Sequence, residues 1–149
     1  MIKAAAGRDF TVLVTETRLE QAETEIFSTG VNKFGQLGIG EVSDCQDFTK
    51  ISPLSNLMYQ QTEGAKATSM RVQDLSCGMD HCVLATDMGV IFEWGANSRG
   101  QLGNKKKNFS EHPLIVKTLN DRKLIDLACR DDSTAVVVEA NIKNTPTDK

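Results

Sequence analysis

The stretch Ile26-Phe27-Ser28-Thr29-Gly30-Val31-Asn32-Lys33-Phe34-Gly35-Gln36-Leu37-Gly38 returns sixty-five positions later as Ile91-Phe92-Glu93-Trp94-Gly95-Ala96-Asn97-Ser98-Arg99-Gly100-Gln101-Leu102-Gly103. Eight of the thirteen positions are identical: an Ile-Phe pair, one glycine, one asparagine and a closing Gly-Gln-Leu-Gly. Self-similarity at a fixed spacing is the sequence signature of repeat architectures. The repeat therefore predicts the architecture of the chain, and it favours a binding scaffold over an enzyme.

A second motif alternates with the first and occurs three times. Its clearest copy reads Leu75-Ser76-Cys77-Gly78-Met79-Asp80-His81-Cys82-Val83-Leu84-Ala85-Thr86, and weaker copies lie seventy-one positions earlier and fifty-two positions later. One aspartate recurs in all three copies, as Asp9, Asp80 and Asp132. In each copy a short apolar run reaches a turn and a second apolar run follows, which is the pattern of paired strands.

The apolar runs have the length of strands throughout the chain. β-Branched and aliphatic residues favour strands, and Asp87-Met88-Gly89 has the composition of a hairpin turn. We expect strands at residues 10–14, 25–28, 83–86, 90–94, 113–119, 124–128 and 134–138. Because long apolar runs of helical period are missing from the sequence, the predicted class is all-β.

The two long repeats differ by an insertion. With the sixty-five-residue offset held, Ile51 and Leu54 align with Val116 and Leu119, and the first copy then holds thirteen additional residues within 55–70. This polar stretch is predicted to be an exposed loop, either a tolerated surface insertion or a loop that contacts a partner. We expect residues 1–140 to form one domain of repeats and residues 141–149 to form a polar, disordered tail.

Composition excludes several classes of function. The chain has 149 residues and a net charge of −3, so it lacks the basic surface that nucleic acid or an anionic membrane would require. A run of about 20 apolar residues, which a membrane span needs, is also missing from the sequence. Four cysteines without a secretory signal predict free thiols in an intracellular protein, most simply a cytoplasmic one.

The motifs together resemble the repeat of the regulator-of-chromosome-condensation family. The resemblance is carried by Cys77-Gly78-Met79-Asp80-His81 and then by Trp94-Gly95-Ala96-Asn97-Ser98-Arg99-Gly100-Gln101-Leu102-Gly103. It implies blades of four strands arranged around an axis, normally about seven in a closed propeller. This chain holds about two and a half repeats, whereas a full ring at this spacing would need roughly 350–400 residues. The resemblance therefore implies a partial propeller of about two blades, an incomplete ring.

The most repeated residues are expected to be structural. The glycines permit positive φ in a chain reversal, Asn97 can bond its own loop backbone, Leu102 plugs the loop from below, and Trp94 packs between neighbouring sheets. The structural set is Gly30, Asn32, Gly35, Gln36, Leu37, Gly38, Trp94, Gly95, Asn97, Gly100, Gln101, Leu102 and Gly103. The outer copies depart from the motif, since Thr29 stands at the position of Trp94 and Phe10 and Ser133 at that of His81.

The recurrent turn residues carry two interpretations. Members of the family that exchange guanine nucleotide on the small GTPase Ran use acidic and histidine residues of these turns to grip the GTPase. The positions of this chain that match are Asp9, Asp80, His81 and Asp132. The alternative is that each aspartate caps its own turn by accepting hydrogen bonds from backbone amides.

The predicted function is a non-catalytic protein–protein interaction or structural subunit. Because an incomplete ring leaves strand edges open, we expect the chain to belong to a larger assembly or to a longer propeller. Either it is a piece of a longer polypeptide, or other protein subunits supply the missing blades or cover the edges. Contacts are expected at the blade edges and at the loops 55–70 and 105–109. We expect neither a metal site nor a cofactor. A guanine-nucleotide exchange factor for a Ran-like small GTPase, or a fragment of one, is the alternative; the repeat portion of a longer ubiquitin ligase or kinase is a third possibility.

Overall fold

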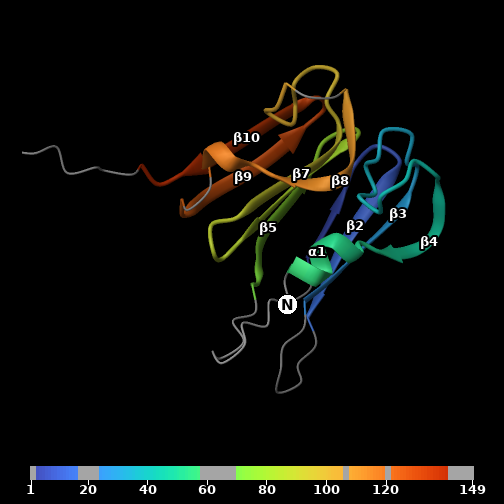
Figure 1. The fold of residues 1–149 in the computed structure, drawn as a ribbon, viewed down its shortest axis with the longest axis horizontal. Coiled ribbons are helices and arrows are strands. Elements are labelled where there is room, and N and C mark those ends of the chain that lie inside the picture. The colour runs from blue at the N-terminus through green and yellow to red at the C-terminus, as the bar shows by residue number, and fades with distance from the viewer. Residues whose placement is uncertain (1–2, 17–23, 58–69, 106–107, 120–121, 141–149) are drawn as a thin grey trace, which may run out of the picture.

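Two four-stranded antiparallel sheets and a two-stranded hairpin make up the fold (Figure 1). The computed structural model describes residues 3–16, 24–57, 70–105, 108–119 and 122–140. Over these residues it confirms the mostly β fold and the partial propeller. The predicted tail, residues 141–149, lies outside the described residues, as do residues 58–69 of the predicted insertion.

Each sheet is a meander in which consecutive strands are neighbours. The first sheet runs in the order β1 (Lys3–Ala6), β2 (Phe10–Glu16), β3 (Thr24–Gly30) and β4 (Cys45–Lys50). The second repeats it with β5 (Val72–Cys77), β6 (His81–Thr86), β7 (Ile91–Ala96) and β8 (Phe109–Ile115). The hairpin of β9 (Leu124–Arg130) and β10 (Ser133–Val138) corresponds to the first half of a third blade.

The sheets lie beside one another in chain order. The first strands of successive blades are in contact, β1 with β5 and β5 with β9, and Figure 1 shows the three groups of strands as successive layers. Lys3 Nζ lies 3.4 Å from Asp74 Oδ1 between β1 and β5, and Gln73 Nε2 donates to Leu124 O at 3.2 Å between β5 and β9. The first strands therefore face the axis of the partial ring.

Two hydrophobic clusters fill the spaces between the three groups of strands. The larger one lies between the first and second sheets and is built from Phe10, Val12, Val14, Ile26, Leu37, Ile51, Leu54, Val72, Leu75, Cys82, Leu84, Phe92 and Trp94. The smaller one lies between the second sheet and the hairpin and contains Val83, Ala85, Ile91, Leu124 and Leu127. Strands β6 and β7 are buried along their whole length because both of their faces are covered.

The last strand of the second blade differs from its prediction. We expected a strand over residues 113–119, but β8 begins at Phe109 and ends at Ile115, and a 3-10 helix follows at Lys117–Leu119. Pro113 thus lies inside an edge strand, next to a register shift between β7 and β8 at Glu93/Gly95. Proline is tolerated there because an edge strand can lack one ladder donor. The prediction placed a strand start at Pro113 and was wrong.

The predicted loop 55–70 begins inside a helix. Helix α1 spans Ser52–Leu57, so residues 55–57 are helical rather than part of a loop. Ser52 followed by Pro53 is a favourable helix start, because proline fixes a helical φ where an N–H is not needed. In the part of the chain that the structure describes, no helix is long and apolar enough to cross a membrane.

Candidate functional site

The three turns that carry the recurrent aspartates are joined to one another through the backbone. The amide of Arg8 donates to the carbonyl of Met79 at 3.1 Å, and the amide of Met79 donates to the carbonyl of Asp131 at 2.7 Å. These three residues occupy the same position in their repeats. Each turn therefore bonds the turn of the next blade, and the three aspartates lie along one end of the partial ring.

Asp80 is held by side chains of the preceding blade. Both of its carboxylate oxygens accept hydrogen bonds from Arg8 Nη2 at 3.0 Å, and Gln36 Nε2 donates to Oδ1 at 3.4 Å. The side chain of Asp80 is only 10 % exposed. A largely buried carboxylate needs such partners, because burying a charge alone is costly.

Asp132 repeats this arrangement one blade further on. Gln101 Nε2 donates to Asp132 Oδ1 at 3.4 Å, and Arg99 Nε lies 3.2 Å from Oδ2. The glutamine of each Gly-Gln-Leu-Gly motif therefore reaches the turn aspartate of the following blade. We call these two contacts, Gln36–Asp80 and Gln101–Asp132, the interblade latch.

Asp9 is in the same repeat position but differs in environment. Its carboxylate is paired with the neighbouring Arg8, at 3.0 Å, and its side chain is 54 % exposed. Among the described residues, these aspartates are thus bound by arginine and glutamine side chains. The alternative prediction, that each one caps its own turn through backbone amides, was wrong for Asp80 and Asp132.

His81 lies inside the molecule rather than on the turn surface. It has no exposed area, and its Nε2 lies 2.9 Å from Thr134 Oγ1 of the hairpin. Burial lowers the pKa of His81, while the nearby Asp132 and Asp80 oppose that shift. The ring is therefore packed between blade and hairpin, and in this structure it is inaccessible to a partner. The four predicted turn residues do not form a single exposed face.

The loop that follows the third strand is closed by its asparagine. Asn32 Oδ1 accepts the amide of Leu37 at 3.0 Å, and Asn97 Oδ1 accepts the amide of Leu102 at the same distance. Leu37 and Leu102 are buried beneath their loops. The asparagine and leucine therefore have the structural roles that the sequence indicated.

Two of the motif glycines sit directly against the second strand of their own sheet. Gly30 has φ +116° and pairs with Phe10, and Gly95 has φ +97° and pairs with His81. Both positions need a left-handed backbone, which glycine adopts without a steric penalty. The glycines Gly35, Gly38, Gly100 and Gly103 also have positive φ.

Trp94 joins the first two blades. It is fully buried, in contact with the larger cluster, and its Nε1 donates to the carbonyl of Gln36 at 2.9 Å. Gly38 lies against its indole ring, where a Cβ would approach Nε1 to 2.9 Å. The loop of the first blade thus contacts the tryptophan of the second blade. This confirms the prediction that Trp94 packs between neighbouring sheets.

A cavity of about 450 Å³ lies between the second blade and the hairpin. Its lining residues are Ile91, Glu93, Arg99, Gly100, Gln101, Gly103, Val116, Thr118, Leu119, Asp132, Ser133, Thr134 and Val136. Glu93 is buried in its wall. Burial raises the pKa of Glu93 to about 7, and the hydrogen-bonded Asn104 side chain opposes the shift.

This shift predicts a pH dependence of stability. The ordinary pKa of the group is 4.5, so between pH 4.5 and about 7 the folded chain holds a proton that the unfolded chain has lost. The contribution of Glu93 to the free energy of unfolding should therefore fall as the pH rises through this window, by roughly 1–3 kcal/mol after allowance for solvent in the cavity. The lowered pKa of His81 acts in the opposite direction below pH 6.5, so the Glu93 contribution is read as the difference in urea unfolding between the wild-type chain and Glu93→Gln over a series of pH values. An unchanged slope in the variant would contradict the assignment to Glu93.

The hydrogen bonds of Asp80 predict that its removal lowers stability, and Asp9 at the same repeat position provides the comparison. Asp80→Ala leaves Arg8 and Gln36 without their shared acceptor, and it should lower the free energy of unfolding by about 1–3 kcal/mol. Asp9→Ala is the matched control, since its exposed ion pair contributes less than about 1 kcal/mol. Urea unfolding of the two variants measures both effects. Equal losses would show that burial of Asp80 between the blades has no energetic weight.

Comparison with known proteins agrees with this geometry. The model of the regulator of chromosome condensation (RCC1) repeat matches residues 24–85 and 88–137. The chain belongs to the regulator of chromosome condensation repeat family. The match covers both of the long repeats and reaches into the hairpin of the third blade.

Curated relatives are much longer than this chain. The probable E3 ubiquitin-protein ligase HERC4 of Homo sapiens is 32 % identical over 116 residues, which cover 78 % of the chain and 10 % of HERC4. The ultraviolet-B receptor UVR8 of Arabidopsis thaliana is 28 % identical over 139 residues, which cover 93 % of the chain and 28 % of UVR8. The chain therefore spans about a tenth of the length of HERC4 and under a third of the length of UVR8.

Solved structures share the fold over most of the chain. Human WBSCR16 superposes with a TM-score of 0.67 at 24 % identity, covering 93 % of this chain and 31 % of that one. The structure of Kap60 bound to yeast RCC1 (Prp20) matches with a TM-score of 0.62 at 14 % identity, covering 87 % and 28 %. At these identities the likeness establishes the fold alone.

Proposed function

We propose that this chain is a non-catalytic structural or interaction subunit that works within a larger assembly or a longer propeller. The observation that carries the proposal is the unfinished third blade. Two sheets have four strands each, whereas the hairpin β9–β10 stands as a two-stranded sheet among the described residues. Unpaired strand edges invite pairing with another chain.

The contacts that the repeated polar residues make support this proposal. Gln36, Gln101 and Asp80 are engaged in contacts between blades, and His81 is packed under the hairpin. Groups that hold blades together are poor candidates for chemistry on a substrate. The repeat therefore favours a scaffold whose partners bind its edges and loops.

The size of the native particle tests the proposal. Antibody detection of the chain after gentle lysis and size-exclusion chromatography of its source cells should place it in a particle well above its own 16.3 kDa. Added purified chain, at tracer concentration in buffer, is the reference for its unassembled size. Elution of the native chain at its own mass, without a partner, would contradict the proposal.

A guanine-nucleotide exchange factor, or a fragment of one, remains the second candidate. It is favoured by one observation: the side chains of Asp9 and Asp132 keep 54 % and 39 % exposure along the same end of the ring. An exchange factor must bind the nucleotide-free GTPase more tightly than the nucleotide-bound one. The chain should then accelerate release of labelled guanine nucleotide from a Ran-like GTPase, and Asp9→Ala should reduce that acceleration. Release at the spontaneous rate excludes this candidate.

A further inference from the structure

Cys77 and Cys82 face each other across the hairpin of β5 and β6. They are direct partners in the antiparallel register, and the amide of Gly78 donates to the carbonyl of His81 at 2.9 Å one position nearer the turn. Because hydrogen-bonded and non-hydrogen-bonded pairs alternate along an antiparallel ladder, the two cysteines form a non-hydrogen-bonded pair. The Cα atoms of such a pair are about 4.5 Å apart, within the range of roughly 4.4–6.8 Å that disulfides span.

The two thiols also lie on the same side of the sheet. Residues directly opposite one another in a ladder share a face, and both cysteines pack in or against the larger hydrophobic cluster. Burial raises the pKa of the Cys82 thiol well above its ordinary value, and a hydrogen bond with the Cys77 thiol adds to this shift. The two sulfur atoms are therefore neighbours while both thiols are reduced.

The other two copies of the motif place different residues at this pair. The equivalent partners are Ala6 and Thr11 in the first blade and Cys129 and Thr134 in the hairpin of β9 and β10. Cys129 Sγ lies 4.0 Å from Thr134 Oγ1, so side chains at this position do meet across the strands. The position thus accepts alanine, threonine or cysteine, and two adjacent thiols are a property of the second blade.

The two thiols differ in their access to solvent. Cys82 is completely buried, whereas Cys77 is only half-buried. The thiolate is the reactive form of cysteine, and burial in apolar surroundings makes a thiol inert toward solvent reagents. An oxidant that arrives from solvent therefore meets Cys77 first, and Cys82 is held beside it to react second.

We propose that Cys77 and Cys82 form a site of reversible oxidation, at which hydrogen peroxide converts the two thiols into an intrachain disulfide. The thiolate of Cys77 attacks one peroxide oxygen, the O–O bond breaks, hydroxide leaves, and Cys77 becomes a sulfenic acid. The sulfur of Cys82 then attacks the sulfur of Cys77. The S–S bond forms, the S–O bond breaks, and the departing hydroxide takes the proton of the Cys82 thiol as water. Two thiols thus give two electrons to one peroxide, and an external thiol reverses the change by exchange.

The disulfide closes the hairpin directly beneath the turn that joins the three blades. Met79 of this turn donates its amide to Asp131 O at 2.7 Å and accepts the amide of Arg8 at 3.1 Å. Asp80 of the same turn accepts hydrogen bonds from the Arg8 side chain. The cross-link therefore restrains a turn to which both neighbouring blades bind, and the site is independent of the proposed function.

Peptide mapping with a protease that cleaves before aspartate reads the disulfide directly. Such cleavage places the four cysteines on four different peptides, which are residues 44–46, 74–79, 80–86 and 126–130. The reduced full chain is treated with increasing concentrations of hydrogen peroxide, and its remaining thiols are blocked with N-ethylmaleimide before digestion in denaturant. Mass spectrometry should find peptides 74–79 and 80–86 joined, with a mass two hydrogen atoms below their sum. Dithiothreitol should separate them.

Trp94 provides a second readout in the intact chain. It is the only tryptophan of the sequence and the cross-strand partner of Cys82 on β7. A neighbouring disulfide quenches the fluorescence of an indole ring. Emission should therefore fall on oxidation and recover with dithiothreitol, and peroxide should leave it unchanged in Cys77→Ser.

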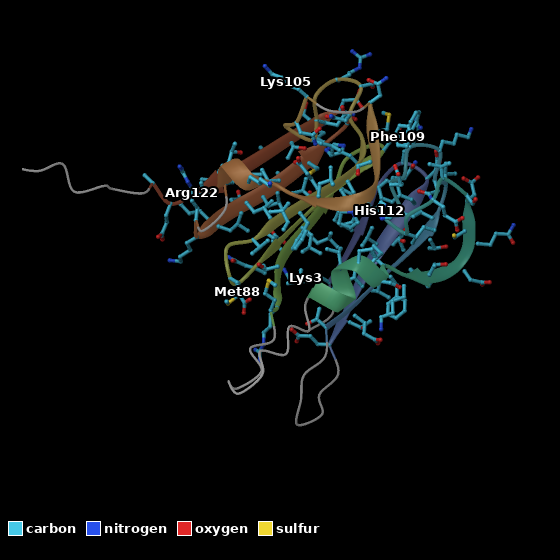
Figure 2. All side chains as sticks on the ribbon, viewed as in Figure 1. Lys3, Met88, Lys105, Phe109, His112 and Arg122 are labelled. Atoms are coloured by element: carbon cyan, nitrogen blue, oxygen red, sulfur yellow. The ribbon has the colours of Figure 1, made fainter. Side chains whose placement is uncertain are left out.

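Four variants, each checked for folding by circular dichroism, make the test specific. Cys77→Ser and Cys82→Ala should both abolish the joined peptides. Cys129→Ser is the matched control, because Cys129 occupies the same repeat position as Cys77, and it should leave their yield unchanged. Lys105→Cys adds a thiol at an exposed position (Figure 2), on a fifth peptide, and this thiol should not link to Cys77.

The peptide map decides the outcome. Peptides 74–79 and 80–86 joined within one folded chain, separated again by dithiothreitol and indifferent to Cys129→Ser, support the proposal. It is overturned if peroxide carries Cys77 to the sulfinic acid while Cys82 stays a free thiol, or if both cysteines stay reduced. Equal linkage of Cys77 to Cys129, or to the thiol added by Lys105→Cys, would also overturn it, because exposure rather than strand register would then choose the partner.

Discussion

Gly95→Val should be among the most damaging single substitutions in this chain. Gly95 has φ +97°, a conformation that a β-branched residue adopts only under strain. Its Cβ would also lie 2.5 Å from the Asp80 carbonyl oxygen and 2.8 Å from His81 Cα, both of them backbone atoms that cannot move aside cheaply. We expect the free energy of unfolding to fall by more than about 4 kcal/mol, or the variant not to fold.

The matched control is Gly100→Val. Gly100 has a similar φ of +80°, but no described atom lies within 4 Å of its Cβ, so this variant carries strain without the clash. We expect it to lose about 1–3 kcal/mol. Urea unfolding monitored by circular dichroism compares the two. If both variants lost the same amount, the close packing of Gly95 on the neighbouring strand would be refuted.

Trp94→Ala should cost about 3–5 kcal/mol of the free energy of unfolding. The substitution leaves a cavity next to Gly38 and removes the hydrogen bond to Gln36 O. It acts on the larger of the two clusters and so on the contact between the first two blades. The same urea measurement serves here, and a loss below about 1 kcal/mol would show that the tryptophan does not join the blades.

Trp94→Phe separates the ring from its hydrogen bond. Phenylalanine keeps most of the buried apolar surface but leaves the Gln36 carbonyl without its indole donor. We expect a loss of about 1–2 kcal/mol, intermediate between the wild-type chain and Trp94→Ala. A phenylalanine variant as damaged as the alanine variant would indicate that the hydrogen bond, not the packed ring, stabilises the interface.

The repeat made the blades predictable from the amino-acid sequence. Residues that recur at a fixed offset must occupy equivalent places, so periodicity alone located the Ile-Phe strands and the Gly-Gln-Leu-Gly loops. The position of Trp94 between sheets followed instead from the resemblance to the family's repeat, because Thr29 stands at the equivalent position of the first copy. Strand ends were less certain, because Pro113 looks like a boundary and is in fact tolerated inside an edge strand.

The partners of the turn aspartates could not be predicted in this way. Arg8 is seventy-two positions from Asp80, and its repeat equivalent is Met79, which has no positive charge. For Asp132 the arginine comes from another loop altogether, as Arg99, whose equivalent in the first repeat is Phe34. Each blade thus recruits its arginine from a different place, and periodicity gives no signal for it. Gln36 and Gln101 do recur, but their contacts with Asp80 and Asp132 became evident only from the structure, which shows how the blades lie relative to one another.

The burial of His81 was also beyond the sequence. A histidine beside a recurrent aspartate in a turn is expected at the surface, where both could reach a partner. The neighbouring hairpin changes this, because Thr134 reaches across from the next blade to the imidazole. Only the stacking of successive blades, a tertiary feature, decides that His81 is internal.

The mass of the purified chain in solution tests the central claim most directly. Size-exclusion chromatography with light scattering, together with circular dichroism of the same sample, reports association and folding at once. An unfinished propeller with open edges should be rich in β structure and should have a mass well above 16.3 kDa that rises with concentration. A folded β protein that stays at 16.3 kDa over the whole concentration range would contradict the claim that its edges require a partner.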